Sequence, residues 1–147
     1  MTSIPLKLAA AALCMTVLVG PATAADSTDQ RHVREVLMST FDKPESRLQV
    51  DPVVVQGDHA IAGWTQGERG GRALLRRHGG AWQITACGGD GLKDATTLVD
   101  AGIPAAEVKT LVQTLGAAEA RLPAAQRAKF STFDGLMRMN AQGTHSH

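Results

Sequence analysis

The chain has 147 residues, enough for one ordinary domain and too few for two. Its 15 Lys and Arg residues nearly balance its 14 Asp and Glu residues, so the formal charge is +1. This balance excludes a strongly cationic nucleic-acid-binding protein, and two Trp, three Phe and no Tyr leave few rings for stacking on bases. We therefore expect no nucleic-acid partner.

Residues 1–24 have the pattern of a secretory signal peptide. Lys7 supplies the positive charge, residues 8–20 form an apolar run, and Ala22-Thr23-Ala24 fits the small-x-small cleavage rule. A helix of about 13 residues spans only about 20 Å, whereas a bilayer core is about 30 Å thick. We expect cleavage after Ala24, so that the exported chain begins at Ala25 and has no membrane span.

The exported chain opens with a helix and continues with four short strands. Apolar residues at helical spacing predict the helix from about Thr28 to Asp42, and Ser27-x-x-Gln30 has the form of a capping box. Turn signals about every eight to twelve residues then predict an antiparallel meander. Its strands span Leu48 to Gln56, His59 to Gln66, Gly71 to His78 and Ala81 to Cys87.

The turns set the register of this meander. A type II′ turn is expected at Gly57-Asp58 because Gly comes first. The loop at 67–70 places Trp64 opposite Ala73, and the Gly79-Gly80 turn places Leu75 opposite Ile84. One predicted face is apolar: Val53, Val55, Ala60, Ala62, Trp64, Ala73, Leu75, Trp82, Ile84 and Ala86. The other is expected to face solvent: Arg72, Arg76, Gln83 and Thr85.

Cys87 is the only cysteine left after cleavage, because Cys14 lies in the signal sequence. An internal disulfide is therefore excluded, and Cys87 is either buried and inert, a metal ligand, or paired with another molecule. The register places it opposite Arg72 and far from any His. Free cysteine tends towards burial, so we expect a structural role.

The C-terminal third of the chain has a helical pattern. Asp90 or Asp94 caps a short helix, Pro104 suits the first turn of a longer one, and a last helix follows Pro123. The apolar stripe of the longer helix keeps the helical period: Val108, Leu111, Val112, Leu115, Ala118 and Leu122.

These elements predict an α+β fold. It is a four-stranded antiparallel meander with an N-terminal helix and about three C-terminal helices packed on one face. Residues 25–135 are expected to form a single domain. Residues 136–147 are expected to form a flexible tail that contains Met and His.

Two groups of residues are candidate metal ligands. His145-Ser146-His147 ends the chain, and Met137-Arg138-Met139 lies just upstream. Imidazoles suit Cu(II) and thioethers suit Cu(I), whereas calcium or magnesium would require clustered carboxylates. His59 and His78 form the second group, because the predicted register places them opposite each other, close enough to share an ion. The alternative is a polar terminus without a function.

The sequence contains no motif for nucleophilic or metal-assisted catalysis. It has no G-x-S-x-G, no H-E-x-x-H, and no Gly-rich phosphate loop before a lysine. The predicted distance between Cys87 and His78, roughly 20 Å along the sheet, excludes a Cys–His pair. We therefore expect a protein that is not an enzyme.

Several segments resemble one family of secreted bacterial proteins, the copper uptake system-associated proteins. They are PVVVQGDHAIAGW at 52–64, GGRALLRR at 70–77, the Cys87 to Ala95 run and Ala101-Gly102-Ile103-Pro104. The likeness covers nearly the whole exported chain. It implies a periplasmic, non-enzymatic accessory of copper uptake that binds or passes on copper ions through its tail. Its partner would be a periplasmic copper chaperone or an outer-membrane copper transporter. The alternative is a periplasmic protein-interaction module with no metal function.

Overall fold

A computed structural model describes residue 3, residues 26–139 and residues 145–146 of the protein. The predicted cleavage site, Cys14 and His147 therefore lie outside the described residues. Among the helices of the described part, none is both long enough and apolar enough to cross a membrane.

The first helix, α1 (Thr28–Phe41), has almost the predicted bounds, and Asp42 is its C-cap. The Ser27 side chain accepts a hydrogen bond from the Gln30 backbone N–H, and the Gln30 side chain accepts one from the Ser27 backbone N–H. This reciprocal pair confirms the predicted capping box. The helix buries Val33 and Leu37 against the sheet.

The predicted meander is present, and its strands run antiparallel in chain order. At the first turn Gly57 has a φ of 57° whereas Asp58 has a negative φ, the combination that a type II′ turn requires. The four strands are β1 (Leu48–Gln56), β2 (His59–Gln66), β3 (Arg69–His78) and β4 (Ala81–Gly88).

The connection between β2 and β3 differs from the prediction. It is a two-residue turn, not a four-residue loop, because β3 already begins at Arg69, which pairs with Gln66. Trp64 therefore lies opposite Gly71 instead of Ala73. Since the register changes by an even number of residues, the side chains keep their predicted faces.

A bulge in β4 changes the register a second time. Leu75 pairs with Ile84 as predicted, but Leu74 pairs with Ala86, so Thr85 is the extra residue on β4. The alternation of polar and apolar residues cannot reveal this extra residue, because the sequence of the bulged strand is still a continuous run of strand-forming residues.

The bulge reverses the facing of the last residues of β4. Ala86 packs on the face opposite to the predicted one, and Cys87 takes its place on the α1 side. Cys87 pairs with Ala73, so its predicted position opposite Arg72 is wrong. The other predicted members of the apolar face all pack in the α1-side cluster.

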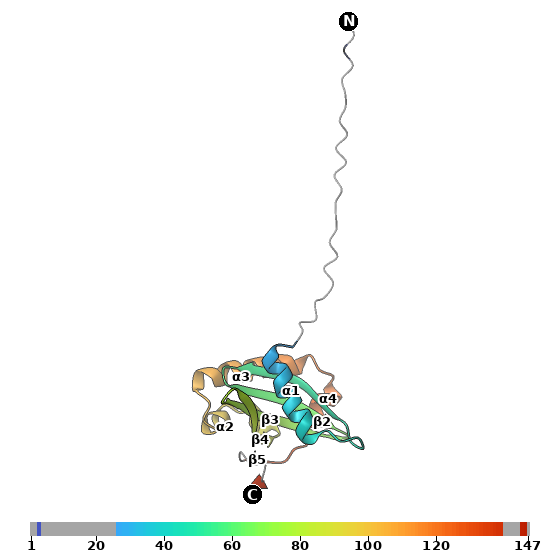
Figure 1. Cartoon of the computed structure of the whole chain (residues 1–147), viewed down its shortest axis with the longest axis vertical. Coiled ribbons are helices and arrows are strands. Elements are labelled where there is room, and N and C mark those ends of the chain that lie inside the picture. Colours follow the sequence, from blue (N-terminus) through green and yellow to red (C-terminus); the bar gives the residue numbers. More distant parts are fainter. Residues whose placement is uncertain (1–2, 4–25, 140–144, 147) are drawn as a thin grey trace.

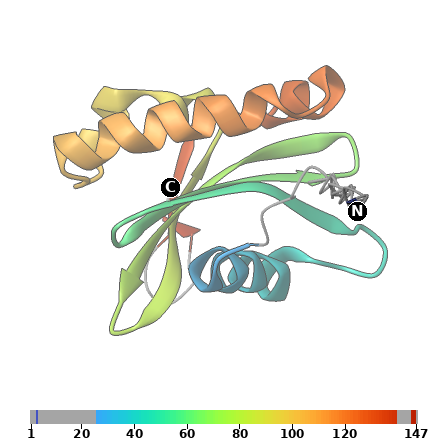
Figure 2. The same cartoon turned by 90° about the horizontal axis from the view of Figure 1, so that it is seen from above.

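Helices cover both faces of the sheet. Figure 2 shows α1 on one side of the sheet and α3 on the other. The face expected to be solvated instead buries Val54, Ile61 and Leu74 against the C-terminal helices. The prediction that all helices pack on one face is therefore wrong. The elements after β4 are the 3-10 helix η1 (Asp90–Lys93), α2 (Ala95–Asp100), α3 (Ala105–Ala120) and α4 (Ala124–Phe130).

Sequence signals placed the C-terminal helices correctly along the chain. Asp94, one of the two expected caps, accepts a hydrogen bond from the Thr97 backbone N–H at the start of α2. Pro104 immediately precedes α3, which buries Val108, Leu111 and Leu115 of the predicted stripe.

The chain continues the sheet where a flexible tail was expected. After Gly135, with a φ of 72°, β5 (Leu136–Met139) pairs with β4, and β6 (His145–Ser146) pairs with β5. Figure 1 shows β5 beside β4. The α+β class and the antiparallel sheet are confirmed, but the sheet extends beyond the predicted four strands. Residues 136–139, expected to belong to the tail, form a strand of this sheet.

Candidate functional site

A pocket of about 210 Å³ lies on the α1 side of the sheet. It is bordered by the last residue of α1, by the strands and by the segment between α4 and β5. Its lining residues are Phe41, Leu48, Trp64, Gln66, Cys87, Phe133, Met137 and Met139. Three of these side chains carry sulfur, and all three come from β4 and β5.

The pairing of β4 with β5 sets the positions of the sulfur-bearing residues. Cys87 lies directly opposite Met137, and Met139 follows two residues later on the same strand and the same face. The bulge in β4 is necessary for this arrangement, because without it Cys87 would lie on the α3 side. Two of the predicted copper ligands thus share a pocket with a cysteine that the sequence marks as structural.

The pocket walls are mainly apolar. Trp64 and Phe133 meet edge to face, with ring centroids 6.1 Å apart and planes at 87°. Trp64 Nε1 is buried and has no hydrogen-bond partner among the described residues. The Gln66 side-chain amide donates to the backbone carbonyls of Phe41 and Ser46, at 2.9 and 2.7 Å. An occupant of the pocket therefore meets chiefly rings, aliphatic groups and sulfur.

Cys87 is a free thiol with an exposed fraction of 5%, so its predicted burial is confirmed. Burial raises the pKa of this thiol to about 11, because the thiolate loses hydration there. The side chain is therefore protonated at neutral pH and is a poor nucleophile. A metal ion changes this condition, since it displaces the thiol proton when it binds sulfur.

The strand β6 places part of the C-terminal segment beside β5. Met139 pairs with His145, and Arg138 pairs with Ser146. The backbone of one predicted imidazole ligand thus lies opposite a residue that lines the pocket. His147, the other predicted imidazole ligand, lies outside the described residues.

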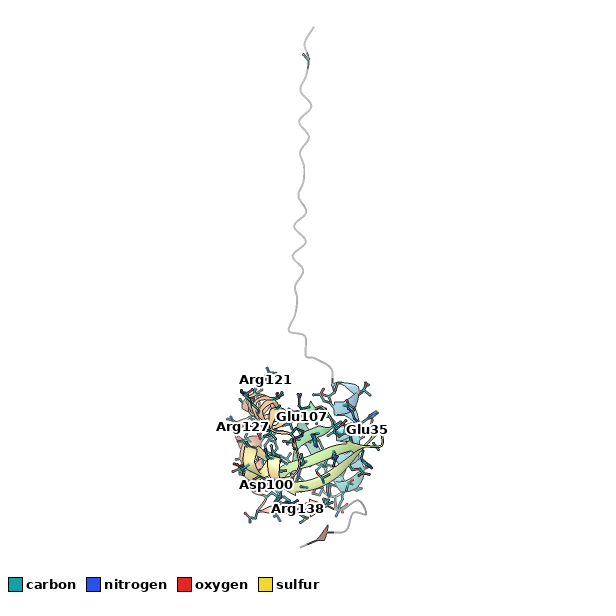
Figure 3. All side chains as sticks on the ribbon, turned by 90° about the vertical axis from the view of Figure 1, so that its left-hand side faces the viewer. Glu35, Asp100, Glu107, Arg121, Arg127 and Arg138 are labelled. Atoms are coloured by element: carbon teal, nitrogen blue, oxygen red, sulfur yellow. The ribbon has the colours of Figure 1, made fainter. Side chains whose placement is uncertain are left out.

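The predicted opposition of His59 and His78 is wrong. The shorter β2–β3 turn places His59 opposite Arg76, and His78 lies opposite Ala81. His59 Nδ1 instead lies 2.9 Å from Oε2 of Glu107. Figure 3 shows Glu107 between the α1 side and the side that carries Arg121 and Arg127. Among the described residues there is no cluster of three or more His, Cys, Asp or Glu that could hold a metal, a finding that does not concern methionine sulfur.

A buried ion pair on the α3 side was not predicted from the sequence. Arg72, expected to face solvent, is only 3% exposed, and its Nε donates to Glu119 Oε1 at 2.8 Å. Its Nη1 donates to Asp90 Oδ1 at 3.1 Å, and its guanidinium lies 5.3 Å from the ring centroid of Phe130. Glu119 falls four residues after Leu115 on the buried stripe of α3, and this spacing is the signal that could have revealed it.

A second pocket, of about 420 Å³, borders this ion pair. Lys93 and Arg127 line it together with Arg72 and Glu119. Because the Arg72 guanidinium already bonds to Glu119 and Asp90, its charge is compensated within the protein. The arrangement joins α3 and η1 to the sheet, and we assign it a structural role.

Of the two pockets described above, the one on the α1 side is lined by sulfur ligands. Thiol and thioether groups bind soft ions such as Cu(I), and imidazole suits Cu(II). Comparisons with family models, with curated proteins and with solved structures each found no match. Function is accordingly inferred from the residues of the site and not from the fold.

Proposed function

We propose that the protein is a non-enzymatic accessory of copper uptake that binds copper ions and passes them on. The observation that carries the proposal is that Met137 and Met139 line one apolar pocket, on a strand that also pairs with His145. The proposal includes export to the periplasm. It also includes transfer to or from a periplasmic copper chaperone or an outer-membrane copper transporter.

The thioether ligands support the transfer step. Methionine sulfur is uncharged at any pH, so Cu(I) binding requires no deprotonation of Met137 or Met139. Both side chains are half-buried, so the ligands of a partner protein have access to an ion held there. A neutral, partly accessible ligand set favours exchange over permanent storage.

The imidazoles support the binding of copper in a second oxidation state, Cu(II). His145 and His147 provide nitrogen ligands for Cu(II), provided that they are neutral. The unperturbed His pKa of about 6.5 implies that Cu(II) binding weakens below that pH. The same C-terminal segment thus offers sulfur to Cu(I) and nitrogen to Cu(II).

Competition titrations against chelators test the proposal, with protein purified without an affinity tag because tags bind copper. Met137→Leu combined with Met139→Leu keeps the apolar volume and removes both thioethers. We expect Cu(I) affinity to fall about tenfold or more and the thermal midpoint to change little. Met38→Leu is the matched control, because Met38 packs on the same core and does not line the pocket.

Deletion of residues 145–147 is the complementary variant. We expect it to weaken Cu(II) binding about tenfold and to spare most Cu(I) binding, since imidazole prefers the divalent ion. If neither variant differs from the wild-type chain for either ion, copper binding by the two thioethers and by the C-terminal imidazoles is excluded.

The alternative function is that of a periplasmic protein-interaction module. The aromatic and aliphatic lining of the pocket favours it, since an apolar side chain of a partner would fit into the pocket beside the contacting rings of Trp64 and Phe133. The same titrations separate the two functions. A wild-type chain that binds neither copper ion leaves only the interaction module.

A further inference from the structure

We propose that Cys87, Met137 and Met139 form a single Cu(I) site in which Cys87 binds the ion as a thiolate. This inference rests on the proposed copper function and deepens it. It assigns the pocket to one oxidation state, and it reverses the structural role that the sequence predicts for Cys87.

The first argument is geometric. Cys87 and Met137 are directly opposed on neighbouring antiparallel strands, a relation that holds Cβ atoms about 4.5–5.5 Å apart. Met139 lies on the same face of β5 and lines the same pocket. The methionine stems have three rotatable bonds, so their sulfur atoms are able to turn towards an ion beside Cys87.

The second argument is the balance of charge. A cation in an apolar pocket is costly unless an opposite charge accompanies it. When Cu(I) binds, a Cu–S bond replaces the S–H bond of Cys87, the proton passes to solvent, and no oxidation state changes. Thiolate and Cu(I) then sum to zero charge. Cu(II) in the same pocket would leave one positive charge uncompensated, so the lining selects the monovalent ion.

The third argument is the exclusion of competing ligands and reagents. Cys87 is 5% exposed, and the Gln66 amide is committed to backbone carbonyls. Aromatic rings of Trp64 and Phe133 form the adjoining wall. An apolar shell of this kind limits the access of water and oxidants to a metal site. It therefore protects the reduced thiol in an oxidising compartment, whereas the half-buried Met137 and Met139 keep the ion accessible to the ligands of a partner.

The test uses the tag-free, exported protein under anaerobic conditions. Addition of Cu(I) to the wild-type chain is expected to produce thiolate-to-copper absorption in the near ultraviolet and to release a proton. Cys87→Ala is expected to abolish this absorption and to weaken Cu(I) binding about a hundredfold. Met38→Leu should leave both properties unchanged. The wild-type absorption decides the question even if the Cys87 variant fails to fold.

The outcomes distinguish this inference from the proposed function. One outcome is that Cu(I) binds without thiolate absorption, that Cys87→Ala still binds it, and that the double variant of Met137 and Met139 does not. This result overturns the thiolate site and leaves the copper function intact. Failure of the wild-type chain to bind either copper ion overturns both. Tighter binding of Cu(II) than of Cu(I) by a chain lacking residues 145–147 overturns the selectivity argued from charge.

Discussion

The two faces of the sheet are both covered by helices, yet their interiors differ. On the α1 side, rings and sulfur-bearing side chains surround a pocket of about 210 Å³. On the α3 side, aliphatic side chains form the buried cluster, and the Arg72–Glu119 ion pair supplies both charges that are buried there. Both faces border a pocket, but the pocket on the α1 side is lined by sulfur ligands, whereas the charged groups at the pocket on the α3 side include an ion pair that compensates itself. This difference explains why the copper proposal concerns only the α1 side.

Replacement of Trp82 by Ala should have the largest effect on the α1 side. Trp82 is 5% exposed, its indole N–H donates to Asp29 at 3.1 Å, and Arg77 lies 5.2 Å from the ring centroid. Loss of the ring should lower the free energy of unfolding by about 3–5 kcal/mol, measured by urea unfolding. Trp64→Ala should cost less, because Trp64 is half-buried and already borders a pocket. An unchanged urea midpoint for Trp82→Ala would show that α1 does not cover this face.

Removal of Glu119 should have the next largest effect, this time on the α3 side. Glu119→Ala leaves the Arg72 guanidinium buried, with Asp90 as its remaining carboxylate partner. Loss of one partner of a buried ion pair lowers the free energy of unfolding by about 3 kcal/mol or more. Because Asp90 still pairs with Arg72, we expect a loss near the lower end of that range.

A double variant sharpens this second prediction. Arg72→Met with Glu119→Leu removes both charges and keeps apolar volume, so it should recover most of the stability lost in Glu119→Ala. Urea midpoints of the two variants and the wild-type chain provide the comparison. A double variant as unstable as Glu119→Ala would mean that the pair contributes more than charge compensation.

The faces also differ in how well the sequence predicts them. Alternation identified the α1 side almost completely, because its residues alternate with Gln83 and Thr85 along β4, and Arg72 and Arg76 flank them on β3. The α3 side was predicted to face solvent because it carries Arg72 and other polar residues. The partner of Arg72, Glu119, is 47 residues away in the sequence. A local pattern contains no information about a pairing over that distance.

Another signal for the α3 side was present in the sequence. Val53-Val54-Val55 and Ala60-Ile61-Ala62 are continuous apolar runs, and such runs are typical of strands that are buried on both faces. Alternation takes account of only every second residue of each run. The intervening residues Val54 and Ile61 both belong to the buried cluster under α3.

The candidate site was only partly predictable. Met137 and Met139 were identified as ligands from their chemistry, but their position was missed because a strand of four residues resembles a polar tail. The meeting of Cys87 with Met137 depends on the bulge at Thr85 and on the β4–β5 pairing. Both features follow from packing of the whole domain and not from local propensity.

Replacement of Cys87 by Ser should have a smaller effect than loss of a ring or an ion pair. The hydroxyl would enter a site that is 5% exposed, where a polar group without a good partner costs about 1–2 kcal/mol. Thermal or urea unfolding of the metal-free protein measures this loss. Cys87→Ala introduces no polar group and should cost less. Equal stability of Cys87→Ser and the wild-type chain would mean that the hydroxyl finds a partner in the pocket.

The smallest expected effect concerns pH and Asp29, at the edge of the α1 side. The hydrogen bond from the Trp82 indole, followed by the one from Arg77, holds the pKa of Asp29 below its ordinary value of 3.8. The unfolded chain therefore binds a proton more readily than the folded one. The stabilisation is fully present above about pH 4 and is lost as the pH falls through the lower, folded pKa.

Asp29→Asn removes the charge and keeps an oxygen that accepts from the indole. The unfolding free energy of this variant should therefore decline less steeply below pH 4 than that of the wild-type chain, and the two curves should converge in acid. Asp100→Asn, at the exposed end of α2, is the matched control for the removal of one carboxylate. If the unfolding free energies of Asp29→Asn and the wild-type chain decline in parallel below pH 4, the charge of Asp29 does not help to hold α1 on the sheet. Apolar packing around Val33 and Leu37 would then hold the helix in place.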